Sequence, residues 1–145
     1  MAVDERLWKI MQKRLGYSDE ELEAFRKNPR NGDVLAKGAE LADKLIVLEV
    51  VESHGCNSRH KVGDRICFDG AGNLLADMSP PKICAYSLNN ALLLIYAANE
   101  MIYAGVDPNQ MRFRRTGCFD VGLRCDGWGK IVYELRVEDR AREQS

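Results

Sequence analysis

The chain lacks both a long hydrophobic run and an excess of positive charge. Its longest uninterrupted apolar stretch covers residues 91–98, whereas a membrane-spanning helix needs roughly 20 apolar residues. Twenty-one lysines and arginines stand against 22 aspartates and glutamates, which gives a net charge of −1 at pH 7. General nucleic-acid binders usually carry a basic excess. Neither a membrane-spanning protein nor a general nucleic-acid binder is therefore expected.

The first residues, MAVDERLWKIMQKRLGYSDEE, also lack the apolar centre of a signal peptide. We therefore expect a cytoplasmic protein. Histidine is scarce, with two residues, but there are five cysteines. In a reducing compartment these cysteines should mostly stay thiols, and they would act as packing groups, metal ligands or nucleophiles.

Residues 1–43 are predicted to form a helical N-terminal extension. Apolar residues recur there at helical spacing, and they are Leu7, Trp8, Met11 and Leu15. Ser18 and Glu21 have the spacing of a capping box that starts a second helix, and Pro29 ends it. A weaker helix is predicted over residues 33–42. Because the apolar stripes are narrow, these helices need a surface to pack on, either the main domain or another chain. We expect them to dock onto a protein partner or a second copy of the chain.

Residues 44–138 are predicted to form an α+β core. Strands are predicted at residues 45–53, 64–70, 111–125 and 130–138, and the first of these is rich in β-branched residues. Residues 79–105 predict one long helix that is apolar nearly all the way round and is therefore central and buried. A polar tail, residues 139–145, is expected to be flexible. This order favours a small antiparallel sheet packed on the long helix.

The stretch SHGCNSRHKVGDRICF, residues 53–68, holds both histidines and two of the cysteines. Three residues separate Cys56 from His60 in a segment compatible with a turn, so both side chains could reach one centre. Zinc is usually held by four such donors. The other candidate donors lie where loops meet predicted elements, and they are Cys84, Cys118 and Cys125. The sequence therefore predicts a zinc site, with iron as the alternative ion.

Two neighbouring groups are assigned other roles. Cys67 lies in the middle of a predicted strand and is expected to pack in the core. His54 is expected either at the surface or in contact with a metal ligand, without binding the metal itself. A closed set of three cysteines and one histidine would be structural, which predicts a small metal-binding accessory subunit of a larger metabolic enzyme assembly.

Two alternatives stay open. The chain could be a small enzyme, either with an open metal position or with Cys56 as a nucleophile beside His60, which Asp64 or Asp120 would orient. Alternatively, Arg112–Arg115 and the Arg-His-Lys run at 59–61 could bind a small anionic ligand such as a phosphate or carboxylate. A solvated strand face would explain the same arginines.

These segments resemble a family of small, uncharacterised prokaryotic proteins that are shorter than this chain. The family pattern has an opening strand ending in C-x(2–3)-H-K-x-G-D, a cysteine at a later helix start and a late cysteine before the last strand. The matching residues are Cys56, His60, Lys61, Gly63, Asp64, Cys84 and either Cys118 or Cys125. Arg59 stands where the family has a glycine. The likeness covers about residues 45–138 and implies that the cysteines and His60 act together, but it implies no reaction.

Overall fold

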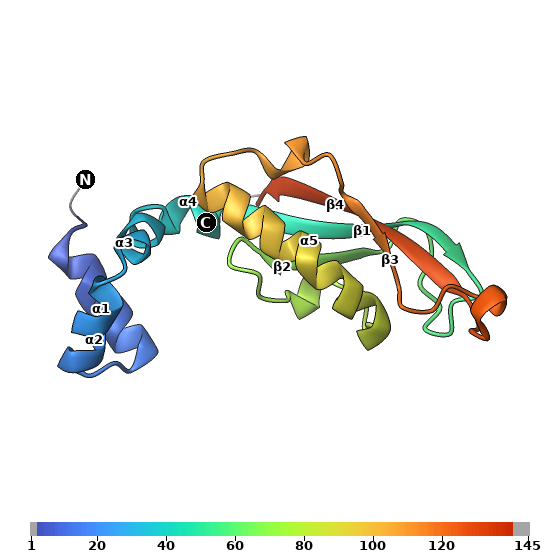
Figure 1. Cartoon of the computed structure of the whole chain (residues 1–145), viewed down its shortest axis with the longest axis horizontal. Coiled ribbons are helices and arrows are strands. Elements are labelled where there is room, and N and C mark those ends of the chain that lie inside the picture. The colour runs from blue at the N-terminus through green and yellow to red at the C-terminus, as the bar shows by residue number, and fades with distance from the viewer. Residues whose placement is uncertain (1–2, 141–145) are drawn as a thin grey trace. The chain divides into compact units, whose positions relative to one another are not determined.

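The computed structural model describes residues 3–140 of the chain, which divides into two compact units, Met1–Glu40 and Leu41–Ser145. The first unit is helical. Its helices are α1 (Glu5–Leu15), α2 (Asp19–Arg26) and α3 (Pro29–Ala36), and the short α4 (Gly38–Ala42) leads into the second unit (Figure 1). The fold class predicted from the sequence, α+β with an N-terminal helical extension, is confirmed.

Local signals in the sequence set the limits of these helices. Gly16 ends α1 with a φ of 73°, a left-handed conformation that glycine adopts readily. The capping box of Ser18 and Glu21 is present at the start of α2. The helix predicted over residues 33–42 is instead two short helices that are separated at Lys37. The first of them begins before residue 33, because the Asn28 side chain caps α3 and Pro29 occupies its first turn.

Aromatic packing holds the first unit together. Trp8 is buried on α1, and its ring lies edge-on to Phe25 of α2 with 6.0 Å between the centroids. The Arg26 guanidinium lies 5.1 Å from the centre of the Trp8 ring, within the range of a cation–π contact.

The second unit is built on one antiparallel sheet with strand order β2-β1-β4-β3. Its strands are β1 (Lys44–His54), β2 (Arg65–Asp69), β3 (Arg115–Gly117) and β4 (Lys130–Asp139). β1 pairs with β4 along most of its length, and a bulge interrupts the register between Val50 and Glu52. A bulge shifts which face the following side chains point to, so it redirects the end of β1 just before the cysteine-containing turn.

Helix α5 (Ala85–Tyr103) covers one face of this sheet (Figure 1). Its buried residues are Ser87, Ala91, Leu94, Ile95, Ala98 and Ile102. The fully buried strand residues on this face include Leu48 and Tyr133. The expectation of a helix buried all round is wrong, because Leu92, Leu93 and Tyr96 are exposed. Helix α5 is a one-sided layer over the sheet.

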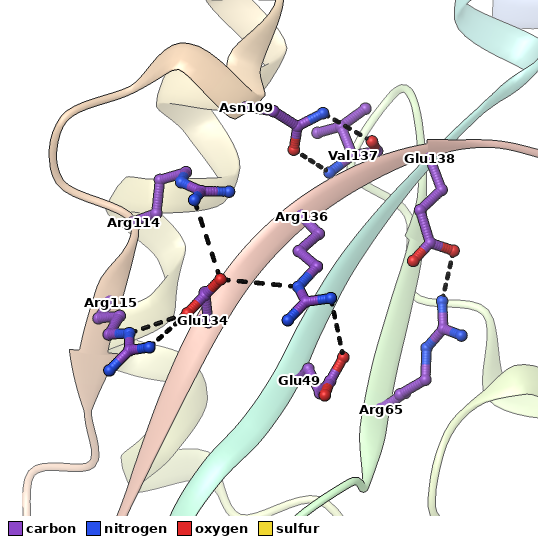
Figure 2. Close-up of polar contacts among 9 residues, drawn as sticks. All are labelled: Glu49, Arg65, Asn109, Arg114, Arg115, Glu134, Arg136, Val137 and Glu138. Atoms are coloured by element: carbon purple, nitrogen blue, oxygen red, sulfur yellow. Dashed lines mark hydrogen bonds and ion pairs between the residues drawn. The ribbon is translucent and has the colours of Figure 1, made fainter.

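The opposite face of the sheet combines a small apolar cluster with a ladder of charges. Leu45, Val47 and Cys67 form the cluster, and Leu75 packs against it. Beside it, Glu134 on β4 is surrounded by arginine side chains (Figure 2). The nearest is Arg115, whose Nη2 lies 2.8 Å from Glu134 Oε2.

Two predicted boundaries change. The strand predicted over residues 111–125 is limited to β3, and the chain then forms a loop with a 3-10 turn at Leu123–Cys125. The predicted tail begins inside β4, because Asp139 is the last residue of that strand and lies 2.8 Å from Lys44 Nζ. The next residue, Arg140, donates its backbone N–H to the Asp43 carbonyl at 2.6 Å, and residues 141–145 lie outside the described residues. No helix within residues 3–140 is long and apolar enough to cross a membrane.

Candidate functional site: a thiol-lined pocket

A pocket of about 340 Å³ opens where the β1–β2 turn, the first turn of α5 and the start of β4 meet. Three cysteines from three separate segments line it: Cys56, Cys84 and Cys118. All three are thiols with partly exposed side chains. Tyr86, Trp128 and Ile131 supply the apolar part of its wall. We call this site the thiol pocket.

The position of Cys56 depends on two backbones that lie unusually close together. Cys56 follows Gly55 at the end of β1, and the Arg59 N–H donates to the Cys56 carbonyl at 3.0 Å to close a turn. A Cβ on Gly129 would overlap the backbone of Gly55. Glycine at 129 therefore allows the β1–β2 turn to lie against the start of β4, which brings Cys56 into the pocket.

Cys84 is fixed through the backbone of the first turn of α5. It is the N-cap residue, and its side chain makes no capping bond. Its carbonyl accepts a hydrogen bond from the Ser87 hydroxyl at 2.7 Å, and the Tyr133 hydroxyl donates to Ser87 Oγ at 2.7 Å. This chain of bonds ties the start of α5 to β4.

The Tyr133 phenol has a raised pKa. Burial raises the pKa of the Tyr133 phenol to about 12, with the hydrogen bond to Ser87 acting in the opposite direction. The thiols of Cys84, Cys118 and Cys56 each add to the upward shift of that pKa. All three thiols therefore act in the same direction as burial and disfavour ionisation of Tyr133.

The sulfur of Cys118 is engaged by the protein backbone. Cys118 Sγ accepts the Ile131 N–H at 3.4 Å and donates to the Asp120 carbonyl at 2.9 Å. The structure, over residues 3–140, shows no hydrogen bond to the sulfur of Cys56 or Cys84. These two thiols are therefore the freer nucleophiles of the pocket.

Asp120 organises the loop that closes one side of the pocket. Its carboxylate accepts the N–H groups of Gly122 at 2.7 Å, Trp128 at 2.9 Å and Gly129 at 3.3 Å. These bonds, that from Trp128 first, hold the pKa of the Asp120 carboxyl below its usual value. The carboxylate is occupied by backbone donors, which explains why the predicted strand becomes a loop and why Asp120 does not orient an imidazole.

His60 lies on the other side of the turn from the thiol pocket. It is 4% exposed, its Nδ1 lies 3.8 Å from Asp64 Oδ2, and its buried Nε2 has no hydrogen-bond partner in the described structure. Arg59, just before it, has a φ of 59°, a left-handed conformation that fits the glycine of the family pattern.

A second pocket, of about 690 Å³, contains His60. We call it the cationic pocket, and the charged or polar residues that define it are Ser58, Arg59, His60, Lys61, Asp64, Arg65 and Lys82. Cys56 lines the thiol pocket and His60 lines the cationic pocket, so the turn divides the predicted pair between two sites.

The predicted metal-binding accessory subunit is therefore wrong. Among residues 3–140, no three His, Cys, Asp or Glu side chains are grouped so that they could hold one metal ion. The structure brings Cys56, Cys84 and Cys118 to one pocket but places His60 in another. Cys125 is exposed and lines neither. The same division separates the two members of the predicted Cys56–His60 catalytic pair.

The sequence also assigned roles to Cys67, to His54 and to the arginines of residues 112–115. Cys67 is buried beside Val47 as expected, and burial raises the pKa of its thiol. His54 is exposed. The predicted anion site loses two of its arginines, because Arg114 and Arg115 both face Glu134 (Figure 2).

Sequence reasoning missed two residues that shape the pocket, Ser87 and Tyr133, and it gave Asp120 a different role. The actual role of Asp120 could have been found from its position two residues before a glycine, which is typical of a side chain that bonds the backbone of its own turn. Ser87 and Tyr133 carry no such signal, because their pairing depends on how α5 lies on β4.

The chain matches no protein-family model, no curated protein and no solved structure. The family resemblance inferred from the cysteine and histidine spacing therefore stays a prediction. The function must be argued from the site itself.

Proposed function

We propose that the protein performs thiol–disulfide exchange, in which a cysteine of the thiol pocket forms a mixed disulfide with a small disulfide molecule. One observation carries this proposal: three separate segments each bring a partly exposed thiol to the same pocket. A cysteine that only packs is expected to be buried, as Cys67 is.

The chemistry needs a thiolate that can reach a disulfide sulfur. The thiolate attacks one sulfur of the ligand, a new bond joins the cysteine to half of the ligand, and the other half leaves as a thiolate. The proton of the cysteine thiol passes to solvent, and the leaving thiolate takes up a proton from solvent. Cys56 and Cys84 suit this attack because, within the part of the chain that the structure describes, no internal hydrogen bond holds their sulfur atoms.

The size and wall of the pocket agree with a small ligand. A volume of about 340 Å³ lies near the lower end of the range of small-molecule sites, roughly 300–1,000 Å³. The predicted cytoplasmic location would keep the thiols reduced, and disulfides formed in such a compartment are usually transient, catalytic or redox-sensing.

Hydroxyethyl disulfide, a small neutral molecule, tests this proposal. Intact mass and peptide mapping should show that Cys56 or Cys84 is modified before Cys125. Cys125 is the matched reference because it is exposed and lies outside the pocket. Cys56→Ser and Cys84→Ser should each be compared with Cys125→Ser. Preferential modification of Cys125 in the folded wild-type chain would contradict the proposal.

A contact between the N-terminal unit and a protein partner or a second copy is a separate proposal. It is supported by the exposed apolar residues of α1, since Ile10 is 61% exposed and Leu15 is 43% exposed. Light scattering should show an assembly for the wild-type chain that Ile10→Gln weakens and Lys9→Gln leaves intact. A wild-type monomer that binds no other protein would contradict it.

A further inference from the structure

The thiol pocket and the cationic pocket share a wall. Ser58 lines both of them. The same two chain segments supply both, because residues 56–60 provide Cys56 on one side and Arg59 on the other, and residues 81–84 provide Lys82 and Cys84.

The cationic pocket carries positive charge that the protein does not neutralise. Arg59, Lys61 and Lys82 form no side-chain ion pair with any described residue. Arg65 is different, because its Nη2 lies 2.5 Å from Glu138 Oε2 (Figure 2). In the thiol pocket, Lys130 is likewise without an ion-pair partner in the described part of the chain.

The carboxylates that lie at the two pockets already accept hydrogen bonds from the protein. Asp64 Oδ2 accepts the Lys61 backbone N–H at 3.0 Å and faces His60. The Asp120 carboxylate accepts three backbone N–H groups. The cationic pocket also holds the buried Nε2 of His60, which has no hydrogen-bond partner in the described structure. Such orphan atoms are rare in folded proteins and call for a functional or structural explanation.

Along the chain, two of the cations lie close to a thiol-bearing residue. The turn closed by the Arg59 N–H and the Cys56 carbonyl keeps the Cα atoms of these residues within about 7 Å. Lys82 and Cys84 are two residues apart, so their Cα atoms are separated by at most about 7 Å. The thiols of one pocket and the cations of the other are therefore carried by neighbouring backbone positions, on either side of the shared Ser58.

We infer that the disulfide taken up by this protein is anionic, a carboxylate-bearing low-molecular-weight disulfide. Its acidic group lies in the cationic pocket while its sulfur meets Cys56 or Cys84. This inference rests on the proposed thiol–disulfide exchange and adds the charge of the ligand. The cations attract and orient the molecule, and the bonds that form and break are those of the exchange step.

Three disulfides of different charge provide the test: dithiodipropionate, which is anionic, hydroxyethyl disulfide, which is neutral, and cystamine, which is cationic. Rates of mixed-disulfide formation at the pocket cysteines are measured by intact mass at low ionic strength. Each rate is divided by the rate of the same probe with a free thiol in solution, which removes the intrinsic reactivity of the probe. Dithiodipropionate should then react about tenfold faster than the neutral probe, the lower end of electrostatic effects in clefts, and cystamine should react slowest.

Removing the charges of the cationic pocket tests its role in ligand preference separately from the exchange reaction. A variant with Arg59→Asn, Lys61→Gln and Lys82→Gln should lose the preference for dithiodipropionate and keep the wild-type rate with hydroxyethyl disulfide. Asparagine is used at 59 because it tolerates a left-handed backbone. Arg124→Gln is the control, since this arginine is exposed and lines neither pocket. Added salt should reduce the wild-type preference, because it screens the charges.

The outcomes distinguish the two proposals. If the corrected rates of the three probes are equal but the pocket cysteines react before Cys125, the anionic preference is wrong and the exchange function stands. If Cys125 reacts first with every probe, the exchange function fails and the inference fails with it. If Arg124→Gln removes the preference as fully as the triple variant, the cationic pocket is not its source.

Discussion

The two faces of the sheet differ in the side chains that they present. Toward α5, the strands present a continuous apolar surface that includes the fully buried Leu48 and Leu135. The opposite face combines the cluster around Val47 with a ladder of glutamates and arginines that remain partly exposed (Figure 2). Register places Glu49 directly opposite Glu134, a like-charge pair that Arg115 and Arg136 offset.

This difference separates stability from function. The apolar face supplies the burial that holds the second unit together. At one end of that same face the apolar residues give way to Ser87, the Tyr133 hydroxyl and the three thiols. The thiol pocket therefore opens at the edge of the rigid layer and takes its geometry from it. The ion pairs of the opposite face contribute little stability, since partly exposed ion pairs are weak.

The largest loss of stability is expected for a substitution on the sheet face that α5 covers. Leu48→Ala should lower the free energy of unfolding by about 3 kcal/mol, because it leaves a cavity where the side chain was fully buried. The exposed Leu93 of α5 is the matched control, and Leu93→Ala should change the same quantity by less than about 0.5 kcal/mol. Denaturant unfolding measures both. Equal losses would show that the two sides of α5 are packed alike.

Tyr133→Phe should have a smaller effect. Loss of the hydrogen bond to Ser87 should cost about 1 kcal/mol in the free energy of unfolding. Exposed Tyr96 serves as the control, and Tyr96→Phe should change the stability little. An equal loss in both variants would mean that the bond from Tyr133 to α5 does not stabilise the fold.

The same substitution should change the response to alkaline pH. In the folded state the pKa of Tyr133 is raised from 10 to about 12, so the neutral phenol is favoured there. Its contribution to stability is complete below pH 10 and is lost as the pH rises through about 12. Denaturant midpoints measured across this window should fall more steeply for the wild-type chain than for Tyr133→Phe.

On the charged face, Glu134→Gln should cost less than about 1 kcal/mol in the free energy of unfolding, and added salt should reduce the difference. Arg115, the closest partner, also holds the pKa of Glu134 below its usual value. A double-mutant cycle with Arg115→Gln measures the coupling energy between the two residues. A coupling energy as large as the loss in Leu48→Ala would invalidate the contrast between the two faces.

The smallest expected change is limited to amide hydrogen exchange in the loop that Asp120 holds. Asp120→Asn should speed amide hydrogen exchange at Gly122 and Trp128, because the charge that holds these N–H groups is lost. In the wild type, the lowered pKa of Asp120 means that this protection is present above pH 3.8 and is lost as the pH falls through the lower folded-state value. Unchanged exchange in the variant would show that the loop keeps its form without the carboxylate.

The sequence predicts the elements of this fold better than it predicts their contacts. Periodicity places α1, β1 and β4 closely, because each has a clear apolar pattern or a capping signal. The start of α5 is predicted too early, since residues 79–82 are polar or proline and precede the N-cap at Cys84.

The candidate site was predicted only in part. Spacing along the chain singles out Cys56 and Cys84, which line the same pocket, but it does not indicate the direction in which each side chain points. A left-handed residue at Arg59 places His60 in a different pocket, and nothing in a spacing pattern gives that φ. For the same reason, spacing cannot distinguish Cys118, which lines the pocket, from Cys125, which does not.

The close approach of Gly55 and Gly129 limits how this pocket can change. Two main chains lie in contact there with no room for a side chain, so the separation of these two walls is set by backbone alone. Substitution at either position would force the walls apart and would not merely reshape the pocket. Any change in the range of ligands admitted must therefore come from the side chains that line the pocket, among them Asn57 and Tyr86.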